Sequence, residues 1–541
     1  MLGLLLLAVL PLLSLAYVAL QGGGDAWPHL LRYVLPSTIL DTVLLLIFVA
    51  IGSGVLGISA AWLTTLCSFP ARRFFVWALM LPLAVPTYIA AYCMVEIWDY
   101  TGPLQSAVRS LGGFSSPQDY WFPDIRSVWG AALIFSLVLY PYVYLTTRLT
   151  FAMQGASVLE VSRSLGASPM RMFKKIAVPL VRPAAAAGIA LVLMETLNDI
   201  GAVEYLGIRT VTFAVFETWL NRDNLSGAVQ LAILTLVIIA LLIWLERSNR
   251  QKRNFSNSAR DTPPARLYLS PAKKWSAFVF CSLILFGGFG VPVWVLGRYA
   301  LSRTDQLSEP ELWSSLINTV EVAGATGILT VSVAYIVLLT ARLSGQPKIA
   351  FVGKFASLGY AVPGTVLAIG LLMPLAAFDN WLDGQMRETF AISTGLAITG
   401  SIAILIYVCS LRFLAIAWGT LESAMMRVSE HVDMAARGLG RTPFQLALQV
   451  HTPILRSALG AAFLLVFVDT TKELSATLLL RPFGFQTLAT MIYDRTSQAA
   501  VEDAAVAALC IVALGIVPVL WLTRSQLTSK KRKKNAGTGP A

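Results

Sequence analysis

Residues 160–179 read EVSRSLGASPMRMFKKIAVP, and residues 434–453 read MAARGLGRTPFQLALQVHTP. Each segment is polar and basic and lies between two long apolar runs. Both contain Leu-Gly, a Pro three residues after the Gly, and a second Pro thirteen residues after it. The matching pairs are Gly166 with Gly440, Pro169 with Pro443, and Pro179 with Pro453. The two members of each pair are separated by the same number of residues, called here the repeat offset. This 541-residue chain is therefore predicted to be a tandem duplication.

The composition indicates a membrane protein. Hydrophobic residues make up 56% of the chain and charged residues 13%, against about 25% charged in soluble domains. Runs of roughly 20 apolar residues indicate helices that cross a lipid bilayer. The net charge of +12 is typical of basic cytoplasmic loops, and no basic domain with interleaved aromatics indicates nucleic-acid binding. The five Cys lack a CxxC pair and the three His lack ligand spacing, so no tight metal site is expected.

The predicted fold is an all-α polytopic protein of about twelve transmembrane helices, arranged as two parallel six-helix repeats. The N-terminal run is read as the first span, not as a signal peptide. The expected spans are 2–20, 39–66, 74–96, 128–148, 183–205, 227–246, 276–297, 315–341, 351–376, 390–412, 458–480 and 502–522. With both termini cytoplasmic, 30 of the 41 Lys and Arg lie on the cytoplasmic side, as the positive-inside rule requires.

These spans define four parts of the chain. The first repeat covers 1–250 with its repeated loop at 148–182, and a polar, basic linker covers 251–275. The second repeat covers 276–524 with its loop at 413–457, and a basic cytoplasmic tail covers 525–541.

Two pairs of acidic residues recur inside the repeats. Glu195 and Asp199 align with Asp469 and Glu473, and each pair is four residues apart, or one helical turn. An ionisable group in mid-span costs roughly 2.5–3.5 kcal/mol, which favours a functional site. If the halves pack around a pseudo-two-fold axis, the four carboxylates line one cation pathway. The alternative is a structural network in which Lys472 neutralises its neighbours.

Proline residues interrupt two equivalent spans. LPLAVP ends at Pro86 and LGYAVP ends at Pro363, which is followed by Gly364. Because Pro removes a backbone hydrogen bond, it permits a kink. The kinks are either static or hinges for gating.

The repeated loops are expected to form a short helix, a Gly turn and a second helix along the cytoplasmic face. Pro169 suits a first helical turn and Gly166 allows the bend before it. Such an amphipathic element is suited to docking a cytoplasmic partner. The alternative is a membrane-surface helix that has no partner.

The loops resemble the EAA motif of inner-membrane permeases of binding-protein-dependent ABC importers, the type I permease fold, in which this motif forms the helix that couples to the ATPase. Glu160, Gly166 and Pro179 match in the first copy, with Val161-Ser162 in place of Ala-Ala. Ala435, Ala436 and Gly440 match in the second copy, where Met434 stands at the Glu position beside Asp433. The resemblance implies that ten residues contact or shape the coupling site: Glu160, Gly166, Pro169, Pro179, Asp433, Ala435, Ala436, Gly440, Pro443 and Pro453.

Three further segments are similar to the fused ferric-iron permeases of this group. They are LPLAVPTYIAAY at 81–92, YAVPGTVLAIGLL at 360–372 and ELSATLLLRPFGFQTLATMIYD at 473–494. The chain has no GxxxxGK[ST], so a phosphate-binding loop must come from another polypeptide. The resemblance therefore implies a non-enzymatic transport subunit of the bacterial inner membrane that itself binds no cofactor.

The implied partners are two copies of a cytoplasmic ATPase, which carries ATP and Mg, and a periplasmic substrate-binding protein. The expected cargo is ferric iron. The alternatives are an ABC permease for thiamine, a polyamine or a phosphonate, or a secondary transporter driven by an ion gradient.

Overall fold

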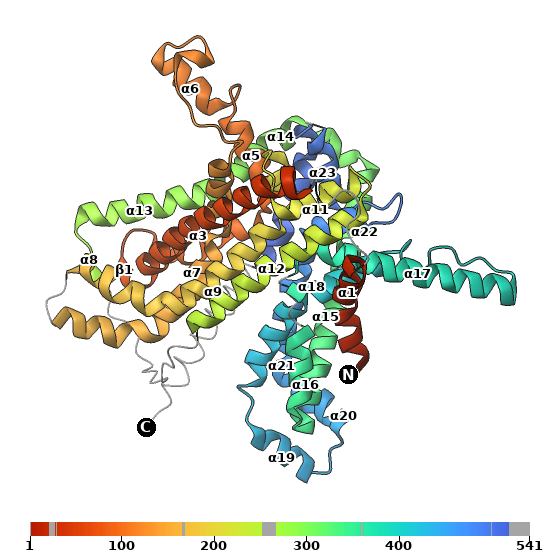
Figure 1. The fold of residues 1–541 in the computed structure, drawn as a ribbon. Coiled ribbons are helices and arrows are strands. Elements are labelled where there is room, and N and C mark those ends of the chain that lie inside the picture. The colour runs from red at the N-terminus through yellow and green to blue at the C-terminus, as the bar shows by residue number, and fades with distance from the viewer. Residues whose placement is uncertain are drawn as a thin grey trace.

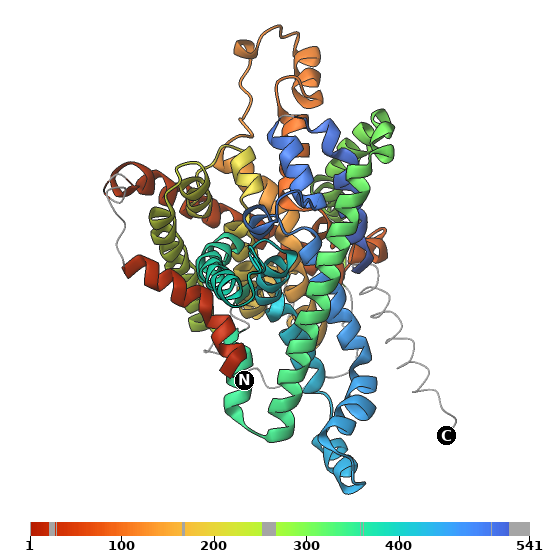
Figure 2. The same cartoon turned by 90° about the vertical axis from the view of Figure 1, so that its right-hand side faces the viewer.

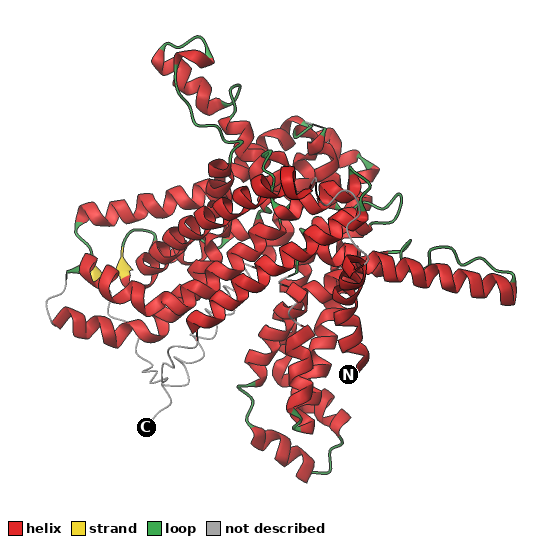
Figure 3. Ribbon diagram, in the orientation of Figure 1, coloured by secondary structure: helices red, strands yellow, loops and turns green. Residues whose placement is uncertain are grey.

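The structure is a computed structural model that describes residues 2–20, 28, 30–164, 168–250, 267–356, 359–360, 362–498 and 500–518. These residues are almost all helical (Figure 3), and the strands among them are β1 (Cys67–Ser68) and β2 (Leu267–Tyr268). The two strands pair in parallel, so the turn after the second expected span lies beside the end of the linker. The helix after the linker begins at Pro271, inside the predicted linker range of 251–275.

The first half contains α1 and the helices that follow it up to the linker. Their bounds are α1 Leu2–Leu20, α3 Leu35–Leu66, α4 Arg72–Ala78, α5 Thr87–Trp98, α6 Pro103–Gly112, α7 Val128–Ser164, α8 Pro169–Met172, α9 Val178–Asn198, α10 Gly201–Tyr205, α11 Val211–Leu220 and α12 Leu225–Arg250. Short 3₁₀ turns occupy Leu81–Ala84 and Pro117–Asp119.

The second half repeats much of this order. Its helices are α13 Pro271–Leu285, α14 Val291–Ser302, α15 Pro310–Ser344, α16 Pro347–Ala356, α17 Gly364–Phe390, α18 Ile402–Met425, α19 Glu430–Gly438, α20 Pro443–Gln445, α21 Thr452–Thr471, α22 Ser475–Leu480 and α23 Leu488–Ser497. Further 3₁₀ turns occupy Thr304–Ser308 and Glu502–Ala504, and a last helix runs over 505–518.

Within the described residues, nine helices are long and apolar enough to cross a membrane. A tenth span is formed if Arg72–Ala84 and Thr87–Gly112, which meet at 96°, are counted together. These ten correspond to the second to eleventh expected spans. The helices at the first and last expected spans, Leu2–Leu20 and 505–518, are not among these ten, and the described part of the last helix stops at 518, so twelve crossings stay a prediction.

Several expected boundaries were wrong. The fifth and eleventh spans start earlier than expected, because continuous helices cover Met170–Asn198 and Pro443–Thr471. The second part of each repeated loop is therefore the start of a spanning helix and not a separate surface helix. Helix continues into both predicted loop ranges, 148–182 and 413–457, since α7 extends to Ser164 and α18 to Met425.

These long helices pass through prolines because the turn before each Pro is widened. Four described π-helical segments, Leu30–Val34, Phe173–Ala177, Phe286–Gly290 and Leu446–His451, each end two residues before a Pro. Pro lacks an N–H and its ring collides with the carbonyl four residues earlier. A π-helical turn moves that carbonyl out of register and keeps the helix continuous.

The two halves form helix bundles that meet at one end and diverge towards the repeated loops (Figure 1). One bundle packs α3, α7, α9 and α12 together, and the other packs α15, α16, α18 and α21. The first expected span of each half packs on the other half: α1 lies along α17, and α14, the second part of the continuous helix Pro271–Ser302, lies against α5 (Figures 1 and 2). This exchange joins the bundles where they meet.

Equivalent hydrogen bonds confirm the duplication. The Val211 N–H donates to the Thr42 hydroxyl oxygen at 3.0 Å, and the Leu488 N–H donates to that of Thr319 at 2.8 Å. Thr42 and Thr319 are as far apart in the sequence as Val211 and Leu488. The two halves therefore share a fold as well as a sequence pattern.

Candidate functional site

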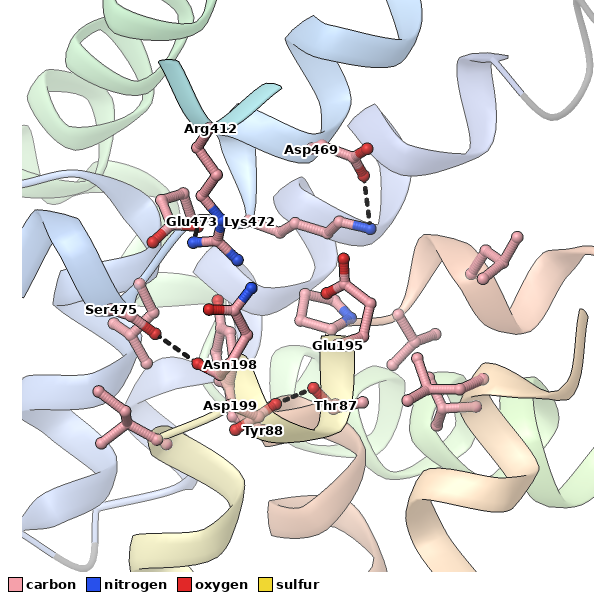
Figure 4. Close-up of a pocket in the computed structure, with 18 of the residues that line it drawn as sticks. Thr87, Tyr88, Glu195, Asn198, Asp199, Arg412, Asp469, Lys472, Glu473 and Ser475 are labelled. Carbon is pink, nitrogen blue, oxygen red and sulfur yellow. Dashed lines mark hydrogen bonds and ion pairs between the residues drawn. The ribbon is translucent and has the colours of Figure 1, made fainter. Parts of the chain in front are cut away.

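A small cavity of about 70 Å³ lies where the two bundles meet (Figure 4). Fourteen of its lining residues form seven pairs whose members are separated by the repeat offset that divides Gly166 from Gly440. The pairs are Val138 with Arg412, Leu139 with Phe413, Glu195 with Asp469, Asn198 with Lys472, Asp199 with Glu473, Ile200 with Leu474, and Gly201 with Ser475. The cavity therefore lies on the pseudo-two-fold axis, and it has room for a few water molecules or a small ion.

All four predicted pathway carboxylates line this one cavity. Their positions on the helices differ from the expectation, because α9 ends at Asn198 and α21 ends at Thr471. Asp199 and Glu473 consequently lie just beyond a helix end and not one turn further along the same helix. Each carboxylate then accepts a backbone N–H at the start of the next short helix, from Ala202 at 2.7 Å and from Ala476 at 2.9 Å.

Asp199 and Glu473 have different side-chain partners in the two halves. The Thr87 hydroxyl donates to Asp199, whereas the Arg412 guanidinium donates to Glu473. Gly364 is the second-half counterpart of Thr87, since each follows the Pro that ends an equivalent segment, Pro363 or Pro86. A Cβ at Gly364 would lie 2.9 Å from both the Arg412 Nη1 and the Glu473 Oε1, so glycine provides the space for that ion pair.

The other two carboxylates also have partners. Asp469 accepts from the Lys472 ammonium at 2.8 Å, and Glu195 accepts from the Tyr360 hydroxyl. The described residues contain no cluster of three or more His, Cys, Asp or Glu side chains that could together hold a metal ion. The carboxylates are thus distributed around the cavity as separately paired groups.

Backbone contacts lock the halves together beside the cavity. The Gly364 N–H donates to the Asn198 amide oxygen at 3.1 Å, and the Ser475 hydroxyl donates to the Asn198 carbonyl at 2.8 Å. Pro86 and Pro363 immediately precede α5 and α17, with φ and ψ of −57° and 143° and of −55° and 144°. The predicted interruptions are therefore real helix breaks that present the first turns of α5 and α17 at the centre of the protein; a gating role stays a prediction.

The structure also shows site residues that the sequence analysis placed elsewhere. Arg412 was counted as cytoplasmic at the end of the span 390–412, but it lies within α18 and is 4% exposed. The signal that could have found it is a lone Arg within an apolar helix. Thr87, Asn198 and Tyr360 carried no comparable signal, because short polar and tyrosine residues are common in spanning helices.

The repeated loops lie at the far ends of the two bundles. In the second copy, α19 is followed by a turn at Gly440, whose φ of +75° suits glycine, and Pro443 begins α20. Ala435, Gly440, Pro443 and Pro453 are exposed and Ala436 is buried. In the first copy, Glu160 lies in the α7 extension, Pro169 begins α8, half-buried Pro179 follows in α9, and Gly166 lies outside the described residues.

Asp433 points inward and not towards a partner. It accepts from the Arg342 Nε at 2.6 Å, and its other oxygen lies 2.7 Å from the His451 Nε2. Arg342 also donates to the carbonyls of Met425 and Val428, both at 2.8 Å. This clamp of Asp433, Arg342 and His451 ties α19 to the end of α15 and to the π-helical turn Leu446–His451 that leads into α21. By the repeat offset, the first-copy counterparts of Asp433 and His451 are Leu159 and Ala177.

The chain is similar in sequence to proteins of a known transport family. Residues 53–253 match the family described as the binding-protein-dependent transport system inner membrane component. The chain is 27% identical over 491 residues to the Fe(3+)-transport system permease protein FbpB 2 of Haemophilus influenzae, covering 90% of this chain and 89% of that relative. The first repeat thus matches the family of binding-protein-dependent transport permeases.

Other relatives match smaller parts of the chain. The ferric transport system permease protein FbpB of Actinobacillus pleuropneumoniae is 25% identical over 461 residues, which cover 80% of this chain and 63% of that protein. The molybdenum transport system permease protein ModB of Escherichia coli K12 is 28% identical over 211 residues, 36% of this chain and 86% of that protein. A relative of about one repeat in length fits the duplication seen in this permease.

Proposed function

We propose that this permease is the membrane-embedded subunit of an ATP-driven importer that translocates ferric iron. A periplasmic binding protein delivers the ion, and two copies of a separate ATPase, which binds ATP and Mg, supply the energy. Both termini and both repeated loops lie in the cytoplasm. The observation that carries this proposal is the cavity on the pseudo-two-fold axis, lined by both pairs of carboxylates.

The chemistry of the cavity favours a hard cation. Hard cations prefer carboxylate, carbonyl and hydroxyl oxygens, and the cavity offers four carboxylates together with the Thr87 and Tyr88 side chains. With Arg412 and Lys472 offsetting two of the four carboxylates, the cavity keeps an excess of negative charge, which disfavours an oxyanion such as molybdate, for which the relative ModB is named. FbpB 2 and FbpB, which each match at least 80% of this chain, are named for ferric iron transport.

The repeated loops are suited to two separate ATPase contacts. They lie at the diverging ends of the bundles, away from the cavity (Figure 1). The second loop exposes Leu439, Phe444 and Leu448 at 82%, 72% and 52%. An exposed apolar group of this kind indicates an interaction site. Because Asp433 ties α19 to α15 and α21, a force applied to this loop moves the whole bundle and the cavity wall with it.

Iron uptake tests the proposal. Cells that depend on this permease, its ATPase and its binding protein are given radioactive ferric iron, and Asp199→Asn and Asp469→Asn are each compared with the unchanged chain. We expect uptake to fall at least about tenfold in both, since each removes one charge that faces the ion. Asp383→Asn, which changes a carboxylate near the far end of α17, is the matched control and should transport normally.

Two outcomes contradict the proposal. Normal uptake by both cavity variants would remove the carboxylates from the pathway. Uptake into vesicles that contain the permease alone, without ATPase or ATP, would instead identify a secondary transporter driven by an ion gradient.

A further inference from the structure

The positive charges of the cavity come from one half of the permease. The carboxylates are duplicated, since Glu195 matches Asp469 and Asp199 matches Glu473. Arg412 and Lys472 have no charged counterpart, because the residues one repeat offset before them are Val138 and Asn198. The second repeat therefore adds two cations to a site that otherwise carries only negative charge.

The two cations are held differently. The Arg412 and Glu473 side chains are 5% and 4% exposed, and Glu473 is fixed further by the Ala476 N–H. The Lys472 and Asp469 side chains are 21% and 20% exposed, and both line the cavity. Lys is a point charge on a flexible four-carbon stem, whereas Arg is a planar group suited to fixed pairing. Arg412 is therefore a permanent partner and Lys472 a movable one.

We propose, on the basis of the function proposed above, that Lys472 is a tethered counter-cation that occupies Asp469 while the cavity is empty. The cargo enters by displacing the Lys472 ammonium from this carboxylate. The Glu195 carboxylate lines the same cavity as Lys472 and can accept the displaced ammonium (Figure 4).

This arrangement selects for ionic charge. A monovalent ion that replaces the ammonium restores only the attraction that was lost, because both carry one positive charge. A trivalent ion gains about three times that attraction from Asp469, and the other three carboxylates of the cavity add to it. When the cargo leaves, the ammonium returns to Asp469 and prevents rebinding, which keeps the site weak enough for transport.

Terbium(III) binding tests the proposal, because this trivalent, oxygen-binding ion becomes luminescent near excited tyrosines, and Tyr88 and Tyr142 line the cavity. The full-length permease is titrated with terbium(III) as the unchanged chain and as Lys472→Met. We expect Lys472→Met to bind at least about tenfold more tightly, because a repelling charge has been removed. We also expect 150 mM sodium, about physiological ionic strength, to compete for the cavity in Lys472→Met and not in the unchanged chain.

Lys354→Met is the matched control. Lys354 pairs with Glu422 at 3.1 Å on an exposed part of the second half, so its loss should leave terbium(III) affinity unchanged. If Lys472→Met does not fold, Asp469→Asn is compared with Asp469→Asn/Lys472→Met. The double variant should then bind about tenfold more tightly than the single one, again because the ammonium is gone.

The outcomes separate this inference from the function on which it rests. Equal terbium(III) affinity with and without Lys472, in a permease whose iron uptake still requires Asp469, contradicts the counter-cation and leaves the iron pathway standing. Unchanged iron uptake in Asp199→Asn and Asp469→Asn contradicts the proposed function itself and the counter-cation with it.

Discussion

Replacing Arg412 with Met should destabilise the permease strongly. The Glu473 side chain is 4% exposed and would lose its cationic partner, keeping the Ala476 N–H as a neutral donor at 2.9 Å. Removing one partner of a buried ion pair costs about 3–5 kcal/mol, because the remaining charge is left uncompensated. At about 1.4 kcal/mol per tenfold change, this lowers the folding equilibrium constant by roughly two to four orders of magnitude.

The loss can be measured by titrating the purified permease from mild detergent into SDS and comparing the apparent free energies of unfolding. Arg412→Met/Glu473→Gln should recover most of the loss, because Gln removes the buried charge and its side-chain oxygen can still accept from Ala476. Lys354→Met breaks a solvent-exposed pair with Glu422 and should cost about 1 kcal/mol or less.

The reasoning fails if Arg412→Met costs no more than Lys354→Met. That result would show that water reaches Glu473 freely and that the pair is not desolvated. It would also remove the distinction between a fixed Arg412 and a movable Lys472.

Two further predictions follow from the contacts that join elements within each half. Thr42→Val and Thr319→Val should each lower the apparent free energy of unfolding by about 1–3 kcal/mol in the same titration. Each variant leaves a buried N–H, that of Val211 or of Leu488, without its acceptor. A much larger effect at one of the two sites would contradict their equivalence. Asp433→Ala should insert normally but lose ATP-dependent uptake and retain less ATPase on co-purification, since α19 loses its ties to α15 and α21; full ATPase retention with normal uptake would contradict the role given to this clamp.

The repeat offset made the centre of the protein predictable before the structure. It paired Glu195 with Asp469 and Asp199 with Glu473, and the cavity brings all four together. The helix ends beside them were not predicted, because the apolar run continues past Asp199 and hydropathy alone does not mark a break. The adjacent Asn198, Asp199 and Gly201 were the available signal, since all three residue types favour turns and helix ends.

Arg412 was placed at the end of a span because the start of that span was set too early. The expected tenth span began at 390, but residues 391–401 form an irregular segment and α18 starts after Ser401, which caps it by accepting the Ala403 N–H. Gly395, Gly400 and Ser401 are turn and cap residues that could have moved the boundary. With the span shifted towards the C-terminus, Arg412 falls near its middle. The contact between Tyr360 and Glu195 could not have been predicted, because it depends on how the two halves pack.

The asymmetry of the cavity follows from its position on the axis. In a symmetric dimer every residue at a two-fold axis faces its own copy, so a Lys there meets a second Lys and an Arg meets a second Arg. A fused duplication removes this constraint, because each half can change independently. In this protein the backbone of the two halves is symmetric, with matching helix breaks at Pro86 and Pro363. The side chains near the axis differ, since Arg412 is the counterpart of Val138 and Lys472 is the counterpart of Asn198. One fused chain can therefore combine four converging carboxylates with a single movable ammonium, which two identical subunits could not do.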